Sequence, residues 1–287
     1  MSQPASAPPI RAVFLDFMGT CLDWHSSVVR ALPTSLTEET RSDLALAWRQ
    51  AFFDDIRSRP PGEAPEDIDV VHERLLRRLL EEGLRTNVAH AFSDASITEA
   101  VQAWHQMTAW QDVYAGLAAV RQQLGVEVFV LANGTTRLQL DLVRSSGLAP
   151  VIDMLFSSQL LGVAKPTPEI YKRALDLVGL GRDGPGGAVM VAAHAYDLRA
   201  AKAVGLRTVY IRRWTDDLDE TDDELLVREN DGYVLDDFAG LAERVPAAAE
   251  EADIGAAVFG YKKHADGDEG VGTMDLTEAT PLLLGTM

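Results

Sequence analysis

The sequence predicts an α/β fold, with a Rossmann-like parallel sheet core and a helical cap inserted after the first strand. Short apolar runs typical of buried strands recur along the chain and alternate with segments of helical periodicity. This alternation is the pattern of βαβ units, which build a mainly parallel sheet. Residues 25–112 interrupt it, because this stretch contains no convincing strand and its apolar side chains follow helical spacing.

Several apolar runs are predicted to form strands, and the prediction is weakest for the last run in the following list. They are residues 12–17, 126–133, 188–193, 207–213 and 154–158. The helical segments between them each close on a glycine, the residue that commonly follows a helix C-terminus. They are residues 138–147, 168–179 and 197–205.

The predicted α/β core is discontinuous and comprises residues 10–24 and 113–250, while the predicted cap comprises residues 25–112. Ser35 and Glu38 have the spacing of a capping box, which would open a long helix of this cap. Open α/β sheets bind ligands in the crevice outside the carboxyl ends of their strands. A cap inserted directly after the first strand would therefore cover the site.

Composition and charge restrict the classes of partner. The chain has 287 residues, 47% of them hydrophobic, and a net charge of −18. Nucleic acid is not expected as a partner, because its binding requires clustered Lys and Arg. The acidic run DDLDETDDE (216–224) is interpreted as a solvated segment. No apolar run is long enough for a membrane span, and the single cysteine, Cys21, favours a cytoplasmic location. Residues 1–9 and 251–287 are expected to be flexible tails.

Polar residues follow the predicted strands at the points where the strands end. Asp16 ends the first strand, Asn133 ends the second, and Asp197 follows the third. Lys165 precedes a proline just before a predicted helix. Each residue alone is also typical of a structural role, but parallel strands bring all of them to one edge, which predicts a site of covalent catalysis. A lysine beside Asp16 would keep that carboxylate ionised and able to attack.

The order DFMGT, LANGTT, AKPTPEIY, AAHAYDLRAAKAVG resembles the motifs of the haloacid dehalogenase superfamily, over roughly residues 10–245. The resemblance implies that Asp16 is the nucleophile. Phosphatases of this superfamily carry a second acid two residues after the nucleophile. They also use Mg²⁺, which is held with the help of a further acid four residues before the position of Asp197. This chain has Met18 and Ala193 at those two positions. It is more similar to the cofactor-independent type II 2-haloacid dehalogenases.

That branch carries a Trp-Arg-Gln triplet in the cap, and this chain has Trp48, Arg49 and Gln50. The resemblance implies that the arginine receives the departing halide and attracts the anionic substrate. The branch also has a tyrosine six residues after its lysine, as Tyr171 stands after Lys165.

The resemblance implies metal-free hydrolytic dehalogenation of a 2-haloalkanoic acid. Asp16 would displace halide to form an ester, and water would release a 2-hydroxy acid. A halide leaves without a proton, so the chemistry does not require a second acid. The predicted catalytic residues are Asp16, Lys165, Asp197 and Arg49. The predicted substrate-binding residues are Thr20, Met18, Gln50, Ala132, Asn133, Tyr171, His194 and Tyr196. We expect a small anionic substrate, no cofactor or metal, no nucleic acid or membrane partner, and a cap face suited to a homodimer.

Some residues differ from the pattern of the type II dehalogenases, so two alternative functions stay open. Ala132 and Ala192 stand where serine is common, and His194 stands where asparagine is common. A lost hydroxyl weakens anion binding by about 1–3 kcal/mol where its partner stays unpaired. Backbone N–H groups and Arg49 would have to offset this loss. The first alternative is a phosphatase of the same superfamily that requires Mg²⁺. The second is a protein that retains the fold for a binding or accessory role, or for another reaction on a natural product.

Overall fold

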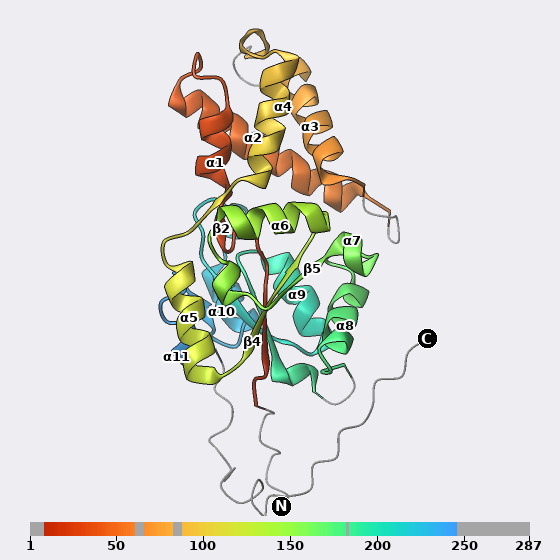
Figure 1. Cartoon of the computed structure of the whole chain (residues 1–287), viewed down its shortest axis with the longest axis vertical. Helices are drawn as coiled ribbons and strands as arrows, with labels where there is room; N and C mark the ends of the chain where they lie inside the picture. Colours follow the sequence, from red (N-terminus) through yellow and green to blue (C-terminus); the bar gives the residue numbers. More distant parts are fainter. Residues whose placement is uncertain (1–8, 61–65, 83–87, 182–183, 246–287) are drawn as a thin grey trace, which may run out of the picture. The chain divides into compact units, whose positions relative to one another are not determined.

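A parallel sheet of six strands lies at the centre of the described residues, 9–60, 66–82, 88–181 and 184–245, of this computed structural model (Figure 1). The strands lie in the order β5-β4-β1-β6-β7-β8. Their bounds are Met154–Ser157 (β5), Glu127–Ala132 (β4), Ala12–Leu15 (β1), Ala188–Ala192 (β6), Arg207–Ile211 (β7) and Val234–Leu235 (β8). Every neighbouring pair is parallel, which confirms the predicted fold class.

Alternate side chains of the central strands face two separate hydrophobic cores. In β1, Val13 and Leu15 face one core, while Ala12 and Phe14 face the other. This follows from the two-residue period of a strand that is buried on both faces. The first core is completed by α5 (Val113–Leu124), α6 (Thr136–Ser145) and α11 (Leu241–Arg244). The second is completed by α8 (Pro168–Leu177), α9 (Ala195–Val204) and α10 (Asp223–Glu229).

The predicted strands and helices of the core are confirmed, with shorter bounds for the strands. Each predicted helix is followed by a glycine with positive φ, at Gly147, Gly179 and Gly205. Strand β8 and the strands Leu22–Asp23 (β2) and Thr108–Ala109 (β3) were not predicted, because a strand of two residues has no readable periodicity. Strand β3 lies within residues 25–112, where no strand was expected. The remaining short helices are α7 (Ser158–Leu161), η1 (Ala89–Ala91), η2 (Ala103–His105), η3 (Ala149–Val151) and η4 (Pro185–Gly187).

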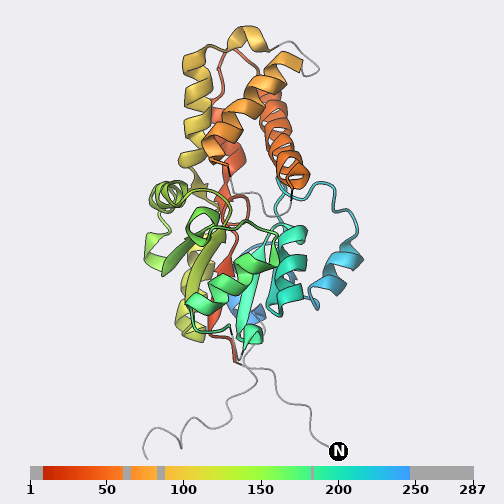
Figure 2. The same cartoon turned by 90° about the vertical axis from the view of Figure 1, so that its right-hand side faces the viewer.

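A group of helices is inserted after the first strand, between β2 (Leu22–Asp23) and β3 (Thr108–Ala109), which pair antiparallel. Its main helices, grouped together in Figures 1 and 2, are α1 (Trp24–Ala31), α2 (Glu38–Ser58), α3 (Ile68–Glu82) and α4 (Asp94–Gln102). They lie where the cap was predicted. The domain boundaries stay predictions, and the predicted tails fall outside the described residues except for Pro9.

The start of α2 differs from the prediction. The helix begins at Glu38, and the Oγ1 of Thr37 caps it by accepting a hydrogen bond of 3.2 Å from the backbone N–H of Thr40. The capping box predicted for Ser35 and Glu38 is therefore wrong. Thr37 stands directly before the first helical residue, so its hydroxyl, rather than that of Ser35, reaches the first turn.

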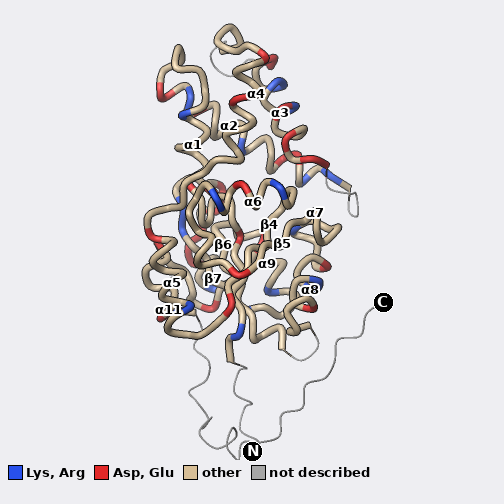
Figure 3. The backbone as a smooth tube through the Cα atoms, in the orientation of Figure 1, with Lys and Arg blue, Asp and Glu red and all other residues tan. Residues whose placement is uncertain are grey.

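Basic side chains are dispersed among acidic ones along the described backbone (Figure 3). An anionic substrate would therefore need individual cations within a site, rather than a general positive field. Among the described residues, no helix is both long and apolar enough to cross a membrane.

Candidate active site

Asp16 follows β1 directly, at the carboxyl edge of the sheet, and both of its carboxylate oxygens are paired. Its Oδ1 accepts a hydrogen bond of 2.7 Å from the Nζ of Lys165. Its Oδ2 accepts one of 2.7 Å from the Oγ1 of Thr20 and lies 2.9 Å from the Nδ1 of His194. The side chain is 9% exposed. The strand therefore delivers one nearly buried carboxylate into a ring of donors.

A tight turn after β1 places Thr20 beneath this carboxylate. Gly19 has φ of 89°, in the region that favours glycine. The Oγ1 of Thr20 also accepts a hydrogen bond of 2.8 Å from the backbone N–H of Ala193, which ties the turn to the loop after β6. A Cβ on Gly19 would lie 2.5 Å from an oxygen of Asp216. Gly19 thus permits both the turn and the close approach of a distant acid.

Gly19→Ala is expected to lower the free energy of unfolding by at least about 1–3 kcal/mol, because it combines backbone strain with the collision against Asp216. Gly125→Ala is the matched control, since Gly125 also has positive φ but a Cβ there would meet nothing within 4 Å. Urea unfolding of both variants measures the difference. Equal losses in the two variants would show that the approach of Asp216 does not constrain Gly19.

Lys165 joins the two acids that the sequence predicted as catalytic. Besides Asp16, its Nζ donates to the Oδ2 of Asp197 at 2.5 Å. The side-chain amide of Asn133 holds the backbone of Lys165: its Oδ1 accepts from the lysine N–H at 2.8 Å, and its Nδ2 donates to the lysine carbonyl at 3.1 Å. Burial alone would lower the pKa of Lys165, but Asp16 and Asp197 outweigh it and raise that pKa. The ammonium therefore stays charged.

The carboxylate of Asp16 is ionised for the converse reason. Burial alone would raise its pKa, but Lys165 and His194 outweigh burial and hold that pKa well below its usual range. Asp197 differs: burial raises its pKa against the opposing effect of Lys165. The hydroxyl of Tyr171 donates to the Oδ1 of Asp197 at 2.5 Å. Asp16 is thus the acid of the pair that its neighbours hold ionised, while Asp197 accepts hydrogen bonds from Lys165 and Tyr171.

His194 stands between two carboxylates. Its Nδ1 faces Asp16, and its Nε2 lies 3.0 Å from the Oδ1 of Asp216. Burial alone would lower its pKa, but Asp16 and Asp216 raise the pKa of His194 to about 10. Both ring nitrogens therefore donate hydrogen bonds, and the side chain is an imidazolium at neutral pH.

This pairing predicts a pH dependence of stability. The folded-state pKa of His194 exceeds its ordinary value of 6.5, so its contribution is complete below about 6.5 and is lost as pH rises through about 10. The free energy of unfolding should therefore fall across that window more steeply in the wild type than in His194→Asn. Urea unfolding at intervals of pH measures both slopes. Parallel slopes would show that His194 is not held protonated by its neighbours.

Asp216 is a site residue that sequence reasoning missed. The run 216–224 was interpreted as solvated, but the Asp216 side chain is fully buried, so that interpretation is wrong at this position. Its Oδ2 accepts from the Trp24 Nε1 at 3.2 Å and from the Thr215 Oγ1 at 2.6 Å. Burial alone would raise the pKa of Asp216, but His194 and Arg49 lower it. Its place after the β7 strand, at the same sheet edge as Asp16, was the available signal.

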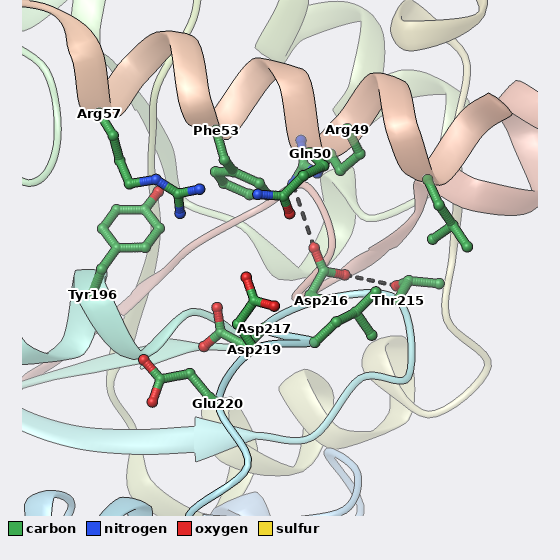
Figure 4. Close-up of a pocket in the computed structure, with 12 residues that line it drawn as sticks. Arg49, Gln50, Phe53, Arg57, Tyr196, Thr215, Asp216, Asp217, Asp219 and Glu220 are labelled. Atoms are coloured by element: carbon green, nitrogen blue, oxygen red, sulfur yellow. Dashed lines mark hydrogen bonds and ion pairs between the residues drawn. The ribbon is translucent and has the colours of Figure 1, made fainter. Parts of the chain in front are cut away.

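Arg49 reaches the site from α2. Its guanidinium donates to the Sδ of Met18 at 3.1 Å and to the Met18 carbonyl at 3.3 Å, and lies 3.5 Å from Asp216. The same group stands 4.6 Å from the centre of the Phe53 ring. Figure 4 shows Arg49, Gln50 and Phe53 on α2, facing the loop of Asp216. The cap thus places the cationic side chain of Arg49 beside Met18, two residues after Asp16.

Only some of the other predicted substrate-binding residues line a cavity. Gln50 and Tyr196 line a cavity of about 120 Å³, and Asn133, Lys165 and Tyr196 line a second one of about 620 Å³. Neither lining includes the other predicted substrate-binding residues, Thr20, Met18, Ala132, Tyr171 and His194. Tyr171 is fully buried on Asp197, and Ala132 is buried with its carbonyl bonded to Gln139. Substrate contact by these residues stays a prediction.

The donor set does not suit Mg²⁺. The carboxylates of Asp16 and Asp197 are both already paired with the ammonium of Lys165. Met18 and Ala193 supply no oxygen side chain. Among the residues described, no three His, Cys, Asp or Glu side chains are grouped as metal ligands. Mg²⁺ prefers near-octahedral oxygen ligands, and this site does not offer them.

A buried, ionised aspartate at the end of a central parallel strand, bonded to a lysine, has the features of a candidate active site. The chain belongs to the haloacid dehalogenase-like hydrolase family, whose model matches residues 10–205.

Individual relatives narrow the type of hydrolase. The crystal structure of the L-2-haloacid dehalogenase PA0810 is 31% identical, with a TM-score of 0.68, and the match covers 82% of this chain and 99% of that protein. The (S)-2-haloacid dehalogenase 4A of Burkholderia cepacia is 29% identical over 206 residues, 71% of this chain and 84% of the relative. The plasmid phosphoglycolate phosphatase of Cupriavidus necator is 27% identical over 213 residues, 71% of this chain and 81% of the relative. The chain is a hydrolase of the haloacid dehalogenase type.

Proposed function

We propose that this hydrolase converts a 2-haloalkanoic acid to a 2-hydroxy acid through a covalent ester on Asp16, without a metal. The observation that carries the proposal is the environment of Met18. In a phosphatase of this superfamily that position would hold the acid that protonates the leaving alkoxide. Here Met18 accepts hydrogen bonds from Arg49. A cation that can receive a departing anion thus takes the place of a proton donor, which suits a halide leaving group.

In the first step an oxygen of Asp16 attacks C2 of the substrate, and the carbon–halogen bond breaks with its electron pair leaving on the halide. In the second step water attacks the ester carbonyl carbon of Asp16. The bond between that carbon and the oxygen now joined to C2 then breaks. This releases the 2-hydroxy acid, a proton and the free carboxylate of Asp16. The attacking oxygen must be ionised, which the low pKa of Asp16 provides.

The two carboxylate oxygens have different surroundings, which supports different roles. Oδ1 faces Lys165 alone, so it is the oxygen assigned to attack. Oδ2 faces Thr20 and His194, so in the ester it is the carbonyl oxygen. When water attacks, negative charge develops on this oxygen, and two donors already point at it. Preorganised donors of this kind are a large source of catalysis in ester hydrolysis.

The test compares two products under matched conditions. Halide release from 2-chloropropionate and phosphate release from a generic phosphate ester are followed with and without a chelator of divalent metal ions. The proposal expects halide release that the chelator does not reduce and that Asp16→Asn removes. Chelator-sensitive phosphate release would support the second candidate, a phosphatase, which the phosphatase relative favours and the donor set opposes. If neither halide nor phosphate is released at high enzyme concentration, both candidate functions are contradicted. The predicted homodimer and cytoplasmic location stay predictions.

A further inference from the structure

Two cavities of different size adjoin the candidate active site, and both are lined by Phe53 and Tyr196. The smaller measures about 120 Å³ and the larger about 620 Å³. Pockets that bind drug-sized ligands measure about 300–1,000 Å³, so the larger cavity is of that class. A small haloacid such as 2-chloropropionate has only a handful of non-hydrogen atoms and would leave most of it unfilled.

The larger cavity is lined by apolar side chains from both the cap and the core. The cap helices contribute the buried side chains of Phe52, Ile68 and Val71. The core contributes apolar residues as well, together with Asn133 and Lys165; they are Val163, Ala164, Pro166 and Pro168. Charged side chains of the cap, Arg57, Arg59 and Glu66, also belong to the lining. The apolar part of this lining suits a ligand with an apolar body that packs against Phe52, Ile68 and Val71.

The larger cavity adjoins a residue that is bonded to the reacting group. Lys165 lines it, and the Nζ of that residue is bonded to the Oδ1 of Asp16. The apolar wall comes close to the strand ends as well, because a Cβ on Gly134 would lie 3.5 Å from the Cδ1 of Ile68. A substrate whose C2 stands at Asp16 can therefore extend a substituent past Lys165 along the apolar wall.

We propose that the substituent on C2 of the substrate is a large apolar group, an alkyl chain of several carbons or an aryl group, which occupies the larger cavity. This inference rests on the proposed function and adds the class of substrate to it. Burying each further methylene on these walls favours binding by about 0.8 kcal/mol, or roughly fourfold.

The direct test measures kcat/KM for halide release with 2-bromoalkanoic acids of increasing length, from propionate to octanoate. The expected rise is about fourfold per methylene, or about 10²–10³-fold in all, before the cavity is full. A flat or falling series, with halide released from the short acids, would overturn the inference and leave the proposed function standing.

A variant that fills the cavity sharpens the test. Ile56 lies on α2 and lines the larger cavity, so Ile56→Trp should lower the ratio of kcat/KM for the octanoate to that for the propionate by at least about tenfold. Val70→Trp is the control, because Val70 is 53% exposed and is not part of that lining. An unchanged ratio in Ile56→Trp would place the substituent elsewhere.

A binding measurement separates failure of the inference from failure of the proposed function. Isothermal titration of the full chain with octanoate and propionate, which carry no halogen, should give at least about 10²-fold tighter binding of octanoate. If octanoate binds tightly but no haloacid is turned over, the apolar site stands and the reaction is wrong. Equal, weak binding of both acids would overturn the inference, whatever the outcome for halide release.

Discussion

Asp16→Asn is expected to reduce halide release by a factor of about 10⁴–10⁶, the range seen when an enzyme loses its nucleophile. The amide cannot carry the charge that attacks C2, and no other carboxylate in the described part of the chain is bonded to both Lys165 and Thr20. Asp197 is close, but it is fully buried and bonded by both Lys165 and Tyr171. Halide release is measured with the substrate that the wild type prefers.

A second readout shows that Asp16→Asn acts through charge rather than misfolding. Asp16 is one of the two carboxylates that raise the pKa of His194 to about 10. Losing that charge should lower the pKa of His194 by at least about one unit, as followed by nuclear magnetic resonance of the imidazole. Asp23→Asn, which changes a helix-capping acid outside this network, should leave the pKa of His194 unchanged. Near wild-type halide release by a folded Asp16→Asn would contradict the assigned nucleophile.

Lys165→Met is expected to impair both stability and catalysis. The methionine fills a similar volume but leaves two buried acids without their shared cation. Breaking a buried pair in this way costs about 3–5 kcal/mol of the free energy of unfolding. Without Lys165, only His194 opposes the effect of burial, so the pKa of Asp16 rises and its ionised form needs a higher pH. The pH profile should therefore shift upward, and the maximal rate should fall by at least about 10²–10³-fold.

The control for this variant is Lys172→Met, which removes an exposed lysine from α8. It should leave the unfolding free energy and the pH profile close to those of the wild type. If Lys165→Met loses stability but keeps the wild-type pH profile, Lys165 supports the fold without setting the ionisation of Asp16. If it loses neither, the three buried charges do not act together.

The meeting of Asp16, Lys165 and Asp197 could be predicted because it depends on the sheet. Apolar runs identify the strands, parallel strands end at one edge, and the residues after them converge there. The roles within that group were less accessible to sequence reasoning. Asn133 was predicted to bind substrate, but its amide is bonded to the backbone of Lys165. A local pattern shows where a side chain stands along the chain, but not which partner it finds.

The acidic run around Asp216 pointed away from its burial, although its place after β7 was a signal for the sheet edge. It opens an acidic run, and such runs are usually solvated. Its partners are Trp24, Arg49 and His194, which come from α1, α2 and the loop before α9. These contacts span distant parts of the chain, so they depend on how the helical insert meets the strand ends. The two cavities depend on the same packing, and their volumes have no signal in the sequence.

The central claim, an ester on Asp16, is tested most directly by one turnover in water labelled with oxygen-18. Enzyme in excess over a 2-haloalkanoic acid is quenched after a single turnover, and the product and the peptide that contains Asp16 are weighed by mass spectrometry. The two-step displacement predicts that the heavy oxygen enters Asp16, while the new hydroxyl of the product carries the unlabelled oxygen that Asp16 supplied. Heavy oxygen in the product with none in the Asp16 peptide would mean that water attacks C2 directly, and would contradict the covalent mechanism.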